Sequence, residues 1–548
     1  MGKISSFIVF IIFFLFSSAI AQEDCSLVIE PDVLIIDGNN LDYQPGSTIC
    51  LKGGNKEYLL IQNIHGTADQ PVTIVNHQGQ VIIDTDHYFG IKIAHCSFLK
   101  FSGTGTEGVP YGFFIKKVSQ GAGLSVGDLS TDIEVENVEI SHTAIGGVYA
   151  KTDPSCNDFS STRDKFTMYN FIMHDCYIHD IPDEGFYIGS SKYTGQTLYD
   201  CDTVVLPHVL IGTKIYNNLV ENTGWDGIQV SSAEYDCEVH DNVVLNNSTS
   251  ATPGQMSGIL IGGGSRCKVY NNKIMDGKGD GIDLFGLGSQ MVFNNLLVRN
   301  GKTFNPNDAN DHKHGIYLGM VQGATAPNEW NYLFNNTIVS PKSFGITYHN
   351  EESKAKIFNN VILDPGYTPA QQNAFINIMT NNDFISSENN FTSFNIYDAR
   401  FISVSDDNYD LQVISPLIDQ ASDISDFSVD FDIENRDRPF HQHYDLGAYE
   451  CQSPYINIGE TTDETDIFLY PNPSDQWVKL KTSQKLSDLS VTLFDLLGNP
   501  VMIKRGNLQQ SGKLQINTGS LDEGHYILVL KNKETVLKTM PLVIKHHE

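Results

Sequence analysis

A two-part sequence motif of apolar and polar positions repeats, always in the same order, through the middle of the chain. The first part is hydrophobic-x-Asn-Asn, and the second is x-Gly-hydrophobic-x-hydrophobic. Successive Asn-Asn pairs lie about 23 to 30 residues apart, or about 41 where a longer segment intervenes, and such a period predicts a solenoid. The first part stands at residues 215–218, 269–272, 292–295, 333–336 and 357–360, with a variant at 239–242; the second part begins at Glu184, Asp226, Ser257, Asp280, His314 and Phe344.

Each part of the motif predicts a short strand, because its apolar positions alternate with other residues and turn residues stand on either side. Helical periodicity is essentially absent. Parallel strands joined by turns that stack on one another make a right-handed parallel β-helix, so we predict an all-β fold. The repeat is clear from about residue 130 to 380 and fades over 385–450. We expect the asparagines to form structural ladders at the corners, and the glycines to permit tight bends.

The two ends of the chain differ from this repeat. Residues 1–21 are typical of a signal peptide, with Lys3, an apolar core at 7–16 and a small-x-small cleavage site ending at Ala21. No second long apolar run follows, so we expect no membrane span in the mature protein. We assign residues 22–454 to the β-helix, the polar and acidic residues 455–466 to a linker, and 467–548 to a small β-sandwich.

The last segment contains three specific sequence motifs. It reads Leu-Tyr-Pro-Asn-Pro at 469–473, Phe-Asp-Leu-Leu-Gly at 494–498 and Gly-His-Tyr-Ile at 524–527. These phrases resemble the C-terminal sorting domain of the type IX secretion system. The resemblance implies the type IX secretion machinery as a partner, a Bacteroidota-type cell envelope, and a secreted or cell-surface location.

The formal net charge of −31 argues against nucleic acid and anionic membranes as partners, since both require basic surfaces. It also counts against tight binding of a polyanionic substrate. Nine cysteines leave at least one unpaired in an exported chain. We expect Cys25 and Cys50 to form a disulfide. Cys237 and Cys267 share a repeat position, and we expect them to stack as free thiols in the core.

Two columns of side chains depart from the uniform repeat. In a hydrophobic-x-hydrophobic strand the middle residue points outward, so one outward column runs along the solenoid beside the column that precedes each glycine. Two longer segments, 151–165 and 301–313, are predicted walls of a cleft along this face. The outward column is Tyr187, Gln229, Leu260, Asp283, Tyr317 and Thr347; the neighbouring column is Glu184, Asp226, Ser257, Asp280, His314 and Phe344.

Asp280 and Asp283 flank one Gly-Ile pair, so both carboxylates can converge, and Ca²⁺ would relieve their repulsion. Asp226 lies two turns away, roughly 9–10 Å by strand spacing. That separation also fits the acid and base of an inverting glycosidase. The alternative is that these aspartates only cap turns, because Asp-Gly is common in turns.

The stretches Gly279-Asp280-Gly281-Ile282-Asp283 and His314-Gly315-Ile316-Tyr317 resemble those of the β-helix pectate lyases. The resemblance implies Asp280 and Asp283 as calcium ligands, but Gly279 replaces a third ligand and Tyr317 replaces the catalytic lysine. A β-elimination would then use Tyr317 and His314 for proton transfer. The cations that would meet a substrate carboxylate are Arg266, Lys278, Lys192 and Lys313, and further substrate contacts are expected from Glu184, Tyr187, Gln229 and His312.

Three functions remain open from the sequence. The first is an exported lyase that cleaves a uronate-containing polysaccharide, with His314, Tyr317, Asp226 and Asp283 as the catalytic set; we favour it slightly. The second is a glycoside hydrolase that uses paired carboxylates. The third is a non-catalytic adhesin or glycan-binding protein, because a fold does not establish a function.

Overall fold

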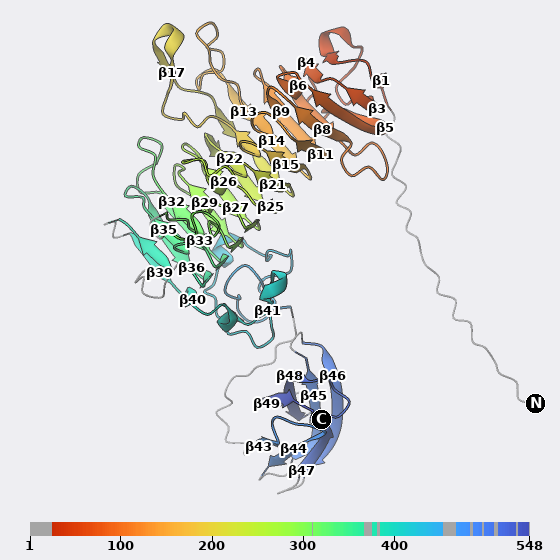
Figure 1. Cartoon of the computed structure of the whole chain (residues 1–548), viewed down its shortest axis with the longest axis vertical. Coiled ribbons are helices and arrows are strands. Elements are labelled where there is room, and N and C mark those ends of the chain that lie inside the picture. The colour runs from red at the N-terminus through yellow and green to blue at the C-terminus, as the bar shows by residue number, and fades with distance from the viewer. Residues whose placement is uncertain are drawn as a thin grey trace, which may run out of the picture.

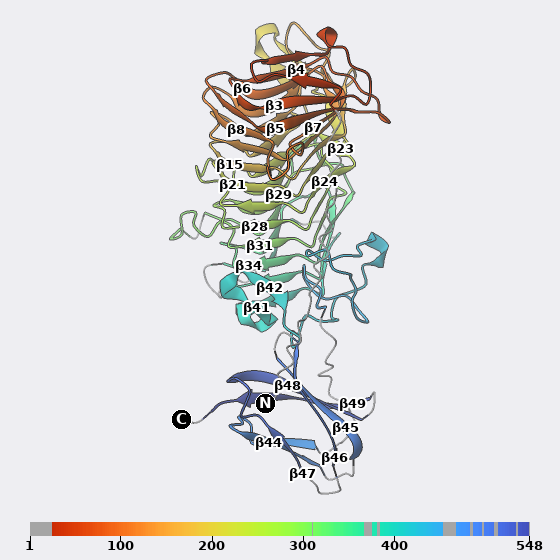
Figure 2. The same cartoon turned by 90° about the vertical axis from the view of Figure 1, so that its right-hand side faces the viewer.

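The computed structural model describes residues 25–546, apart from 309–310, 367–374, 381–383, 453–466, 483–485, 496–497, 509–512 and 533–534. The expected signal peptide and linker therefore lie outside the described residues. Strands stack into an elongated solenoid, and a smaller β-domain follows it (Figures 1 and 2). The only helical elements among the described residues are 3-10 turns at Gly38–Asn40, Tyr199–Cys201, Ile396–Ala399, Val404–Asp406 and Ser425–Phe427.

Each regular turn of the solenoid contributes three parallel strands, and the strands of successive turns pair into three ladders. We name the 12-stranded sheet the site face, because both columns described above lie on it. Its strands are β2 (Ile35–Asp37), β4 (Leu59–Gln62), β6 (Phe89–Ala94), β9 (Ala122–Gly127), β12 (Val148–Ala150), β16 (Phe186–Ile188), β22 (Ile228–Val230), β26 (Ser257–Ile261), β29 (Asp280–Leu284), β32 (Ile316–Leu318), β35 (Ile346–Tyr348) and β38 (Ile376–Ile378).

The other two ladders belong to one 23-stranded sheet, joined at its N-terminal end by the long strands β3 (Thr48–Lys56) and β5 (Val72–Thr85), with β1 (Leu27–Ile29) paired to β3. We name the first of them the aromatic face. Its strands are β7 (Ser97–Ser102), β10 (Thr131–Glu136), β14 (Phe171–His174), β20 (Lys214–Tyr216), β24 (Cys237–His240), β27 (Cys267–Tyr270), β30 (Met291–Phe293), β33 (Trp330–Phe334), β36 (Lys354–Phe358) and β39 (Ile385–Glu388).

The third face lies between them in chain order within each turn. Its strands are β8 (Phe113–Val118), β11 (Val138–Ser141), β15 (Tyr177–Ile181), β21 (Leu219–Thr223), β25 (Val243–Leu245), β28 (Lys273–Met275), β31 (Leu296–Val298), β34 (Thr337–Val339), β37 (Val361–Leu363) and β40 (Phe391–Ser393). Outside the three ladders lie a short sheet of β13 (Thr167–Tyr169), β19 (Val209–Ile211) and β23 (Ala233–Tyr235), and a hairpin of β17 (Gln196–Leu198) and β18 (Thr203–Val205).

The core is one continuous apolar cluster inside the solenoid. Ile259 and Ile282, from successive turns of the site face, stack directly and are fully buried. Burial of such inward positions from all three faces supplies the main stabilisation, because each turn can cover its apolar side chains only against its neighbours. The all-β fold and the parallel solenoid predicted from the repeat are confirmed.

The Asn-Asn pairs divide two structural roles between them. The first Asn of a pair adopts the left-handed conformation, as at Asn271 with φ 54°. The second Asn points inward and is buried; for example, Asn272 Nδ2 donates to Asn295 Oδ1 at 3.0 Å, and Asn295 Nδ2 donates to Asn336 Oδ1 at 2.9 Å. This inner ladder confirms the structural role predicted for the asparagines. It runs through Asn218, Asn242, Asn272, Asn295, Asn336, Asn360 and Asn390.

The glycines that follow the neighbouring column are needed for a different reason from the tight bend that we expected. A Cβ on Gly281 would lie 2.5 Å from the carbonyl oxygen of Gly315, and a Cβ on Gly227 would lie 2.5 Å from that of Gly258. Neither contact leaves room for a side chain. The glycines therefore allow successive turns to approach closely just beside the candidate site.

Residues 394–452, which we call the C-terminal wrap, leave the repeat and pack against the last turns. The wrap contains the hairpin of β41 (Phe401–Ser403) and β42 (Asn408–Leu411), and Phe427 packs against Phe334 and Phe358. The domain that follows has two antiparallel sheets, as expected for a small β-sandwich: β43 (Ile467–Tyr470), β44 (Trp477–Thr482) and β47 (Lys513–Asn517); and β45 (Leu486–Phe494), β46 (Pro500–Leu508), β48 (Gly524–Asn532) and β49 (Thr535–Ile544).

Three disulfides cross-link the solenoid. Cys25 bonds Cys50, as predicted. Cys237 bonds Cys267, so our expectation of free thiols there was wrong: the two residues are direct partners on adjacent parallel strands, with Cα atoms 4.5 Å apart. That distance lies within the range that a disulfide spans. The third bond was not predicted and joins Cys156 to Cys201. Among the described residues, no helix has the length and apolar character needed to cross a membrane.

Candidate functional site

The outward column of the site face has the predicted register. Tyr187 pairs with Gln229, Gln229 with Leu260, and Leu260 with Asp283. Asp283 in turn pairs with Tyr317 on the following turn. The flanking positions, such as Ile282 and Leu284, are buried in the core, so the column points away from it.

In the neighbouring column, Ser257 connects two carboxyl groups. Its backbone N–H donates to Asp226 Oδ1 at 2.7 Å, and its hydroxyl donates to Asp283 Oδ2 at 2.7 Å. The other oxygen of Asp283, Oδ1, has no hydrogen-bond partner among the described residues, although it is buried. A buried carboxyl oxygen without a partner is costly whether or not it carries a proton, so this oxygen is a candidate for contact with a ligand.

Asp280 has a different environment although it lies on the same strand as Asp283. Lys313 Nζ donates to Asp280 Oδ2 at 2.8 Å, and the backbone N–H of His314 donates to Asp280 Oδ1. Both partners favour the ionised carboxylate. Lys313 had been a candidate for binding a substrate carboxylate, and the structure instead places it in this buried ion pair.

Glu184 begins the row of acids at its N-terminal end and is 1% exposed. Gln255, from the irregular segment before β26, bridges it to Asp226. With its amide nitrogen turned toward the acids, Gln255 donates to Glu184 Oε1 at 3.3 Å and to Asp226 Oδ2 at 3.0 Å. Together with Ser257, Gln255 links carboxyl groups from successive turns into one network.

Burial raises the pKa of three of these carboxyl groups. It raises the pKa of Glu184 to about 7 and that of Asp226 to about 8. Burial, followed by the charge of Asp280, raises the pKa of Asp283 well above its usual value. Burial alone would lower the pKa of Lys313, but the carboxylates of Asp280 and Asp283 raise it. The cluster therefore combines three carboxyl groups whose protonated form burial favours with the ion pair between Asp280 and Lys313.

His314 and Tyr317 lie beside this cluster but are poorly suited to act as bases. Burial lowers the pKa of His314 to about 4, and its Nδ1 lies 3.2 Å from Thr347 Oγ1. Burial also raises the pKa of Tyr317, whose hydroxyl lies 3.3 Å from His349 Nδ1. A neutral imidazole with so low a pKa is a weak base, and a phenol with a raised pKa keeps its proton.

Aromatic side chains flank the acids along the solenoid axis. Toward the N-terminal turns, Tyr187 stands 5.5 Å from Tyr149 between ring centroids, with Lys151 Nζ 4.6 Å above the Tyr187 ring. Toward the C-terminal turns, His312 stacks on Phe344 with centroids 5.8 Å apart. His312 is exposed, whereas Gln229, another expected substrate contact, is 3% exposed.

The two predicted wall segments each reach this face: Lys151 and Lys313 are the residues that make the contact. The other expected cations do not join the acid network. Arg266 forms a two-point ion pair with Glu329, with N–O distances of 3.1 and 2.7 Å. Lys278 Nζ donates to the carbonyl oxygen of Thr249, and Lys192 is exposed on a loop.

The residues present do not fit a calcium site. Ca²⁺ binds six to eight oxygen atoms. Around Asp280, however, an ammonium group and a backbone N–H hold both carboxylate oxygens, and Gly279 stands where a third ligand is expected. Calcium binding, which the partial resemblance to pectate lyases implied, stays a prediction, and nothing below depends on it.

Several members of the network were not identified from the sequence. Gln255 lies in a segment with no repeat register, and Ser257 looked like an ordinary member of its column. Tyr149 stands one turn before Tyr187, in line with the outward column. Extending that column toward the N-terminus would have identified it, whereas no sequence signal places Gln255.

Two family models match the chain. Residues 212–392 match the right-handed β-helix region, and residues 468–545 match the secretion system C-terminal sorting domain. The protein is a right-handed parallel β-helix with a secretion sorting domain. The sorting domain indicates export to the cell surface or beyond. No curated protein sequence shows significant similarity to this chain.

Three solved structures illustrate the range of similar folds. A family 136 lacto-N-biosidase from Eubacterium ramulus is 14% identical, with a TM-score of 0.42 over 65% of this chain; the match spans 63% of that enzyme's length. A pectate lyase is 13% identical, with a TM-score of 0.37 over 78% of this chain and 97% of its own. A mannuronan C-5 epimerase module from Azotobacter vinelandii is 14% identical, with a TM-score of 0.31 over 64% of this chain and 91% of its own. Similarities at this level say nothing about activity or substrate.

Proposed function

We propose that the protein is an exported glycoside hydrolase that cleaves a glycan of low charge on the site face. The observation that carries this proposal is the contrast between Asp283, whose pKa burial raises, and Asp280 on the same strand, which accepts hydrogen bonds from Lys313 Nζ and the His314 N–H. Two carboxyl groups in contrasting environments are the usual acid and base partners in glycoside hydrolysis. The sorting domain supports delivery by the type IX machinery.

Asp283 is the proposed general acid. Its carboxyl group donates the proton, which passes to the glycosidic oxygen as the bond to the anomeric carbon breaks. Asp280 is the proposed ionised partner, which takes a proton from the water that adds to the anomeric carbon. Asp226 and Glu184 are positioning residues, because Ser257 and Gln255 connect them to the reacting pair.

The charge around the site supports a weakly charged substrate. Four carboxyl groups and one ammonium group make up the cluster, and the ammonium is already paired with Asp280, so the cluster offers no free cation to a polyuronate. β-Elimination needs a cation for the uronate carboxylate, and Arg266 and Lys313 are both engaged in ion pairs. The lyase prediction therefore becomes the alternative outcome of the test, beside the non-catalytic adhesin.

The test is a substrate screen with two readouts. The full secreted protein is incubated with neutral polysaccharides (xylan, galactan, β-glucan) and with polygalacturonate and alginate, and new reducing ends and absorbance of unsaturated products are measured together. The proposal predicts reducing ends without absorbance, lost in Asp283→Asn and retained in Asp236→Asn, whose exposed side chain lies off the network. Absorbing products would establish the lyase instead. Absence of cleavage in the whole panel would reject the hydrolase in favour of the adhesin.

A further inference from the structure

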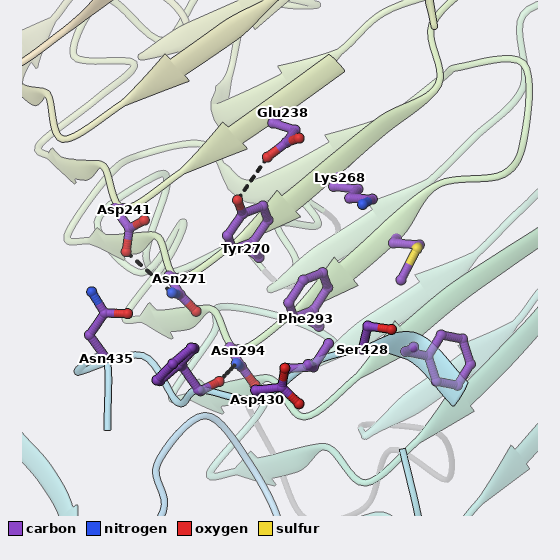
Figure 3. Close-up of a pocket in the computed structure, with 14 residues that line it drawn as sticks. Glu238, Asp241, Lys268, Tyr270, Asn271, Phe293, Asn294, Ser428, Asp430 and Asn435 are labelled. Atoms are coloured by element: carbon purple, nitrogen blue, oxygen red, sulfur yellow. Dashed lines mark hydrogen bonds between the residues drawn. The ribbon is translucent and has the colours of Figure 1, made fainter. Parts of the chain in front are cut away.

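A pocket of about 320 Å³ lies on the aromatic face, between that face and the C-terminal wrap. Its floor comes from β24, β27 and β30, and residues 427–435 of the wrap form its other side (Figure 3). None of its lining residues belongs to the acid network. Its volume is at the lower end of the range for small-molecule sites, which suits one small ligand better than an extended chain.

A break in an asparagine ladder marks this pocket. The first Asn of each pair forms an outer ladder, in which Nδ2 donates to the side-chain oxygen of the preceding turn. Asn389 Nδ2 donates to Asn359 Oδ1 at 3.0 Å, and Asn271 Nδ2 donates to Asp241 Oδ1 at 3.2 Å. By this pattern, the next residue of the ladder, Asn294, should donate to Asn271 Oδ1.

The wrap removes that donor. Asn294 Nδ2 donates instead to the carbonyl oxygen of Phe431 at 2.8 Å, and Arg438 Nη1 donates to Asn294 Oδ1 at 2.6 Å. The wrap thus supplies both partners of the Asn294 amide but none for Asn271. Figure 3 shows the Asn271 amide between Asp241 and Asn294, on the floor of the pocket.

Asn271 Oδ1 consequently has no hydrogen-bond partner among the described residues, although Asn271 is only 9% exposed. A buried amide oxygen without a donor destabilises the folded state. A ligand that donates a hydrogen bond would remove the cost. Because Asn271 lines the pocket floor, its unpartnered oxygen indicates a ligand with donor groups.

The other polar groups of the pocket favour a neutral ligand with several hydroxyls over a cation. Glu238 accepts from the Tyr270 hydroxyl at 2.8 Å, and Asp241 lies 2.6 Å from His240 Nδ1. Three carboxylates, those of Glu238, Asp241 and Asp430, line the pocket with the ammonium of Lys268, but the Tyr270 hydroxyl and His240 already engage two of them. The remaining acceptors can each take a hydroxyl proton, and Lys268 can donate to a hydroxyl oxygen.

The two aromatic rings of the pocket floor present their edges. Tyr270 and Phe293 stack with centroids 4.9 Å apart and an interplanar angle of 3°, so each covers a face of the other. Hydrogen bonds must therefore carry recognition at the floor. Apolar contact comes from the ring edges and from side chains of the wrap, Phe427, Val429 and Phe431.

From this arrangement we propose that the pocket is a second, non-catalytic sugar site, which binds one neutral monosaccharide unit through hydroxyls that donate to Asn271 Oδ1 and to the neighbouring carboxylates. It lies on a different face from the acid network, so it holds a glycan without cutting it. The proposal does not depend on hydrolysis at the site face.

The experiment is saturation-transfer NMR on the full secreted protein with glucose, galactose, mannose, xylose and N-acetylglucosamine, each tested singly, and with spermidine as the cationic alternative. Asn271→Gly removes the unpartnered oxygen, and glycine accepts the left-handed backbone at this position. Asn217→Gly is the matched control, because Asn217 has the same backbone conformation, φ 54°, and is exposed outside the pocket. Ser428→Trp fills the pocket from the wrap.

We expect at least one sugar to give a signal that falls at least about fivefold in Asn271→Gly and in Ser428→Trp and is unchanged in Asn217→Gly. Signal that persists in both pocket variants belongs to the site face and does not count. The proposal is overturned if no sugar shows the variant-dependent signal, or if spermidine alone shows it. A melting temperature within about 2 °C of the parent protein confirms that each variant tested is folded.

Discussion

The site face and the aromatic face are built by the same repeat, yet their outward columns behave in opposite ways. On the aromatic face, like groups stack on like groups: rings from His174 to Phe358 stand 4.6–5.2 Å apart with interplanar angles of 2–14°. On the site face, acids stack near acids and are buried. Stacked rings and amides stabilise the register, whereas buried carboxyls oppose folding.

The difference shows where a repeat protein can place chemistry. Each added turn gives a column of identical residues one more stacking or hydrogen-bonding contact, so identical residues stabilise such a column. The acid column has no such uniform contacts; Ser257, Gln255 and Lys313 supply hydrogen bonds to its carboxyl groups instead. Four predictions test this contrast between the two faces.

Replacing the proposed general acid should lower activity without lowering stability. Asp283→Asn should lower kcat/KM by about 100-fold or more, because a positioned general acid contributes about 10²–10⁴. It should leave the melting temperature equal or higher, since it removes a carboxyl that Asp280 repels. Kinetics on the substrate found in the screen and thermal unfolding measure the two effects. Retention of full activity would contradict the assignment of Asp283.

Disrupting the inner asparagine ladder should instead lower stability. Asn295 Nδ2 donates to the carbonyl oxygens of Val269 and Phe293 and to Asn336 Oδ1. Asn295→Ala leaves these buried groups unpaired, so we expect a loss of about 3 kcal/mol or more in the free energy of unfolding. Urea unfolding measures the loss, with Asn217→Gly as the exposed control. A change below about 1 kcal/mol would show that the ladder is dispensable.

The buried acids should give stability a definite pH dependence. The folded-state pKa values of Glu184 (about 7) and Asp226 (about 8) lie above their unfolded values near 4, so the folded protein binds more protons. Their contribution is fully present below about pH 4 and is lost as pH rises toward 7–8. Melting temperature should therefore fall from pH 5 to pH 8, less steeply in Asp226→Asn than in Asp236→Asn. Equal slopes in both variants would contradict the buried environment of Asp226.

Calcium should have the smallest effect. Because Lys313 and a backbone N–H hold the Asp280 carboxylate, 1 mM Ca²⁺ or EDTA should shift the melting temperature by less than about 1 °C. Thermal unfolding in both conditions measures this. Stabilisation by calcium that disappears in Asp280→Asn would restore the pectate-lyase-like metal site.

The regular parts of this protein could be predicted from the sequence because the repeat itself encodes the register. The spacing of residues such as Asp226, Ser257 and Asp280 places them correctly on successive turns. It also places Cys237 opposite Cys267, where the choice between a thiol pair and a disulfide was made wrongly. The repeat predicts the position of each residue, but it does not predict the bonding or protonation state of the side chains that it brings together.

The irregular segments could not be predicted in the same way. Lys313 and Gln255 come from insertions whose path depends on tertiary contacts, so neither the ion pair with Asp280 nor the bridge to Glu184 had a sequence signal. The Cys156–Cys201 bond likewise joins two insertions. The C-terminal wrap diverts Asn294 from its ladder, a long-range contact that no local pattern reveals.

The Cys237–Cys267 disulfide has a mechanical consequence. In a stack where each turn contacts only its neighbours, an unfolding front moves inward from an end. The disulfide joins two adjacent turns across 30 residues of sequence, so the covalent link carries any tension between them. A chain pulled from both ends outside the cell would extend on either side of this link, while the enclosed segment, which includes Ser257 and Gln255, would remain shielded from the force.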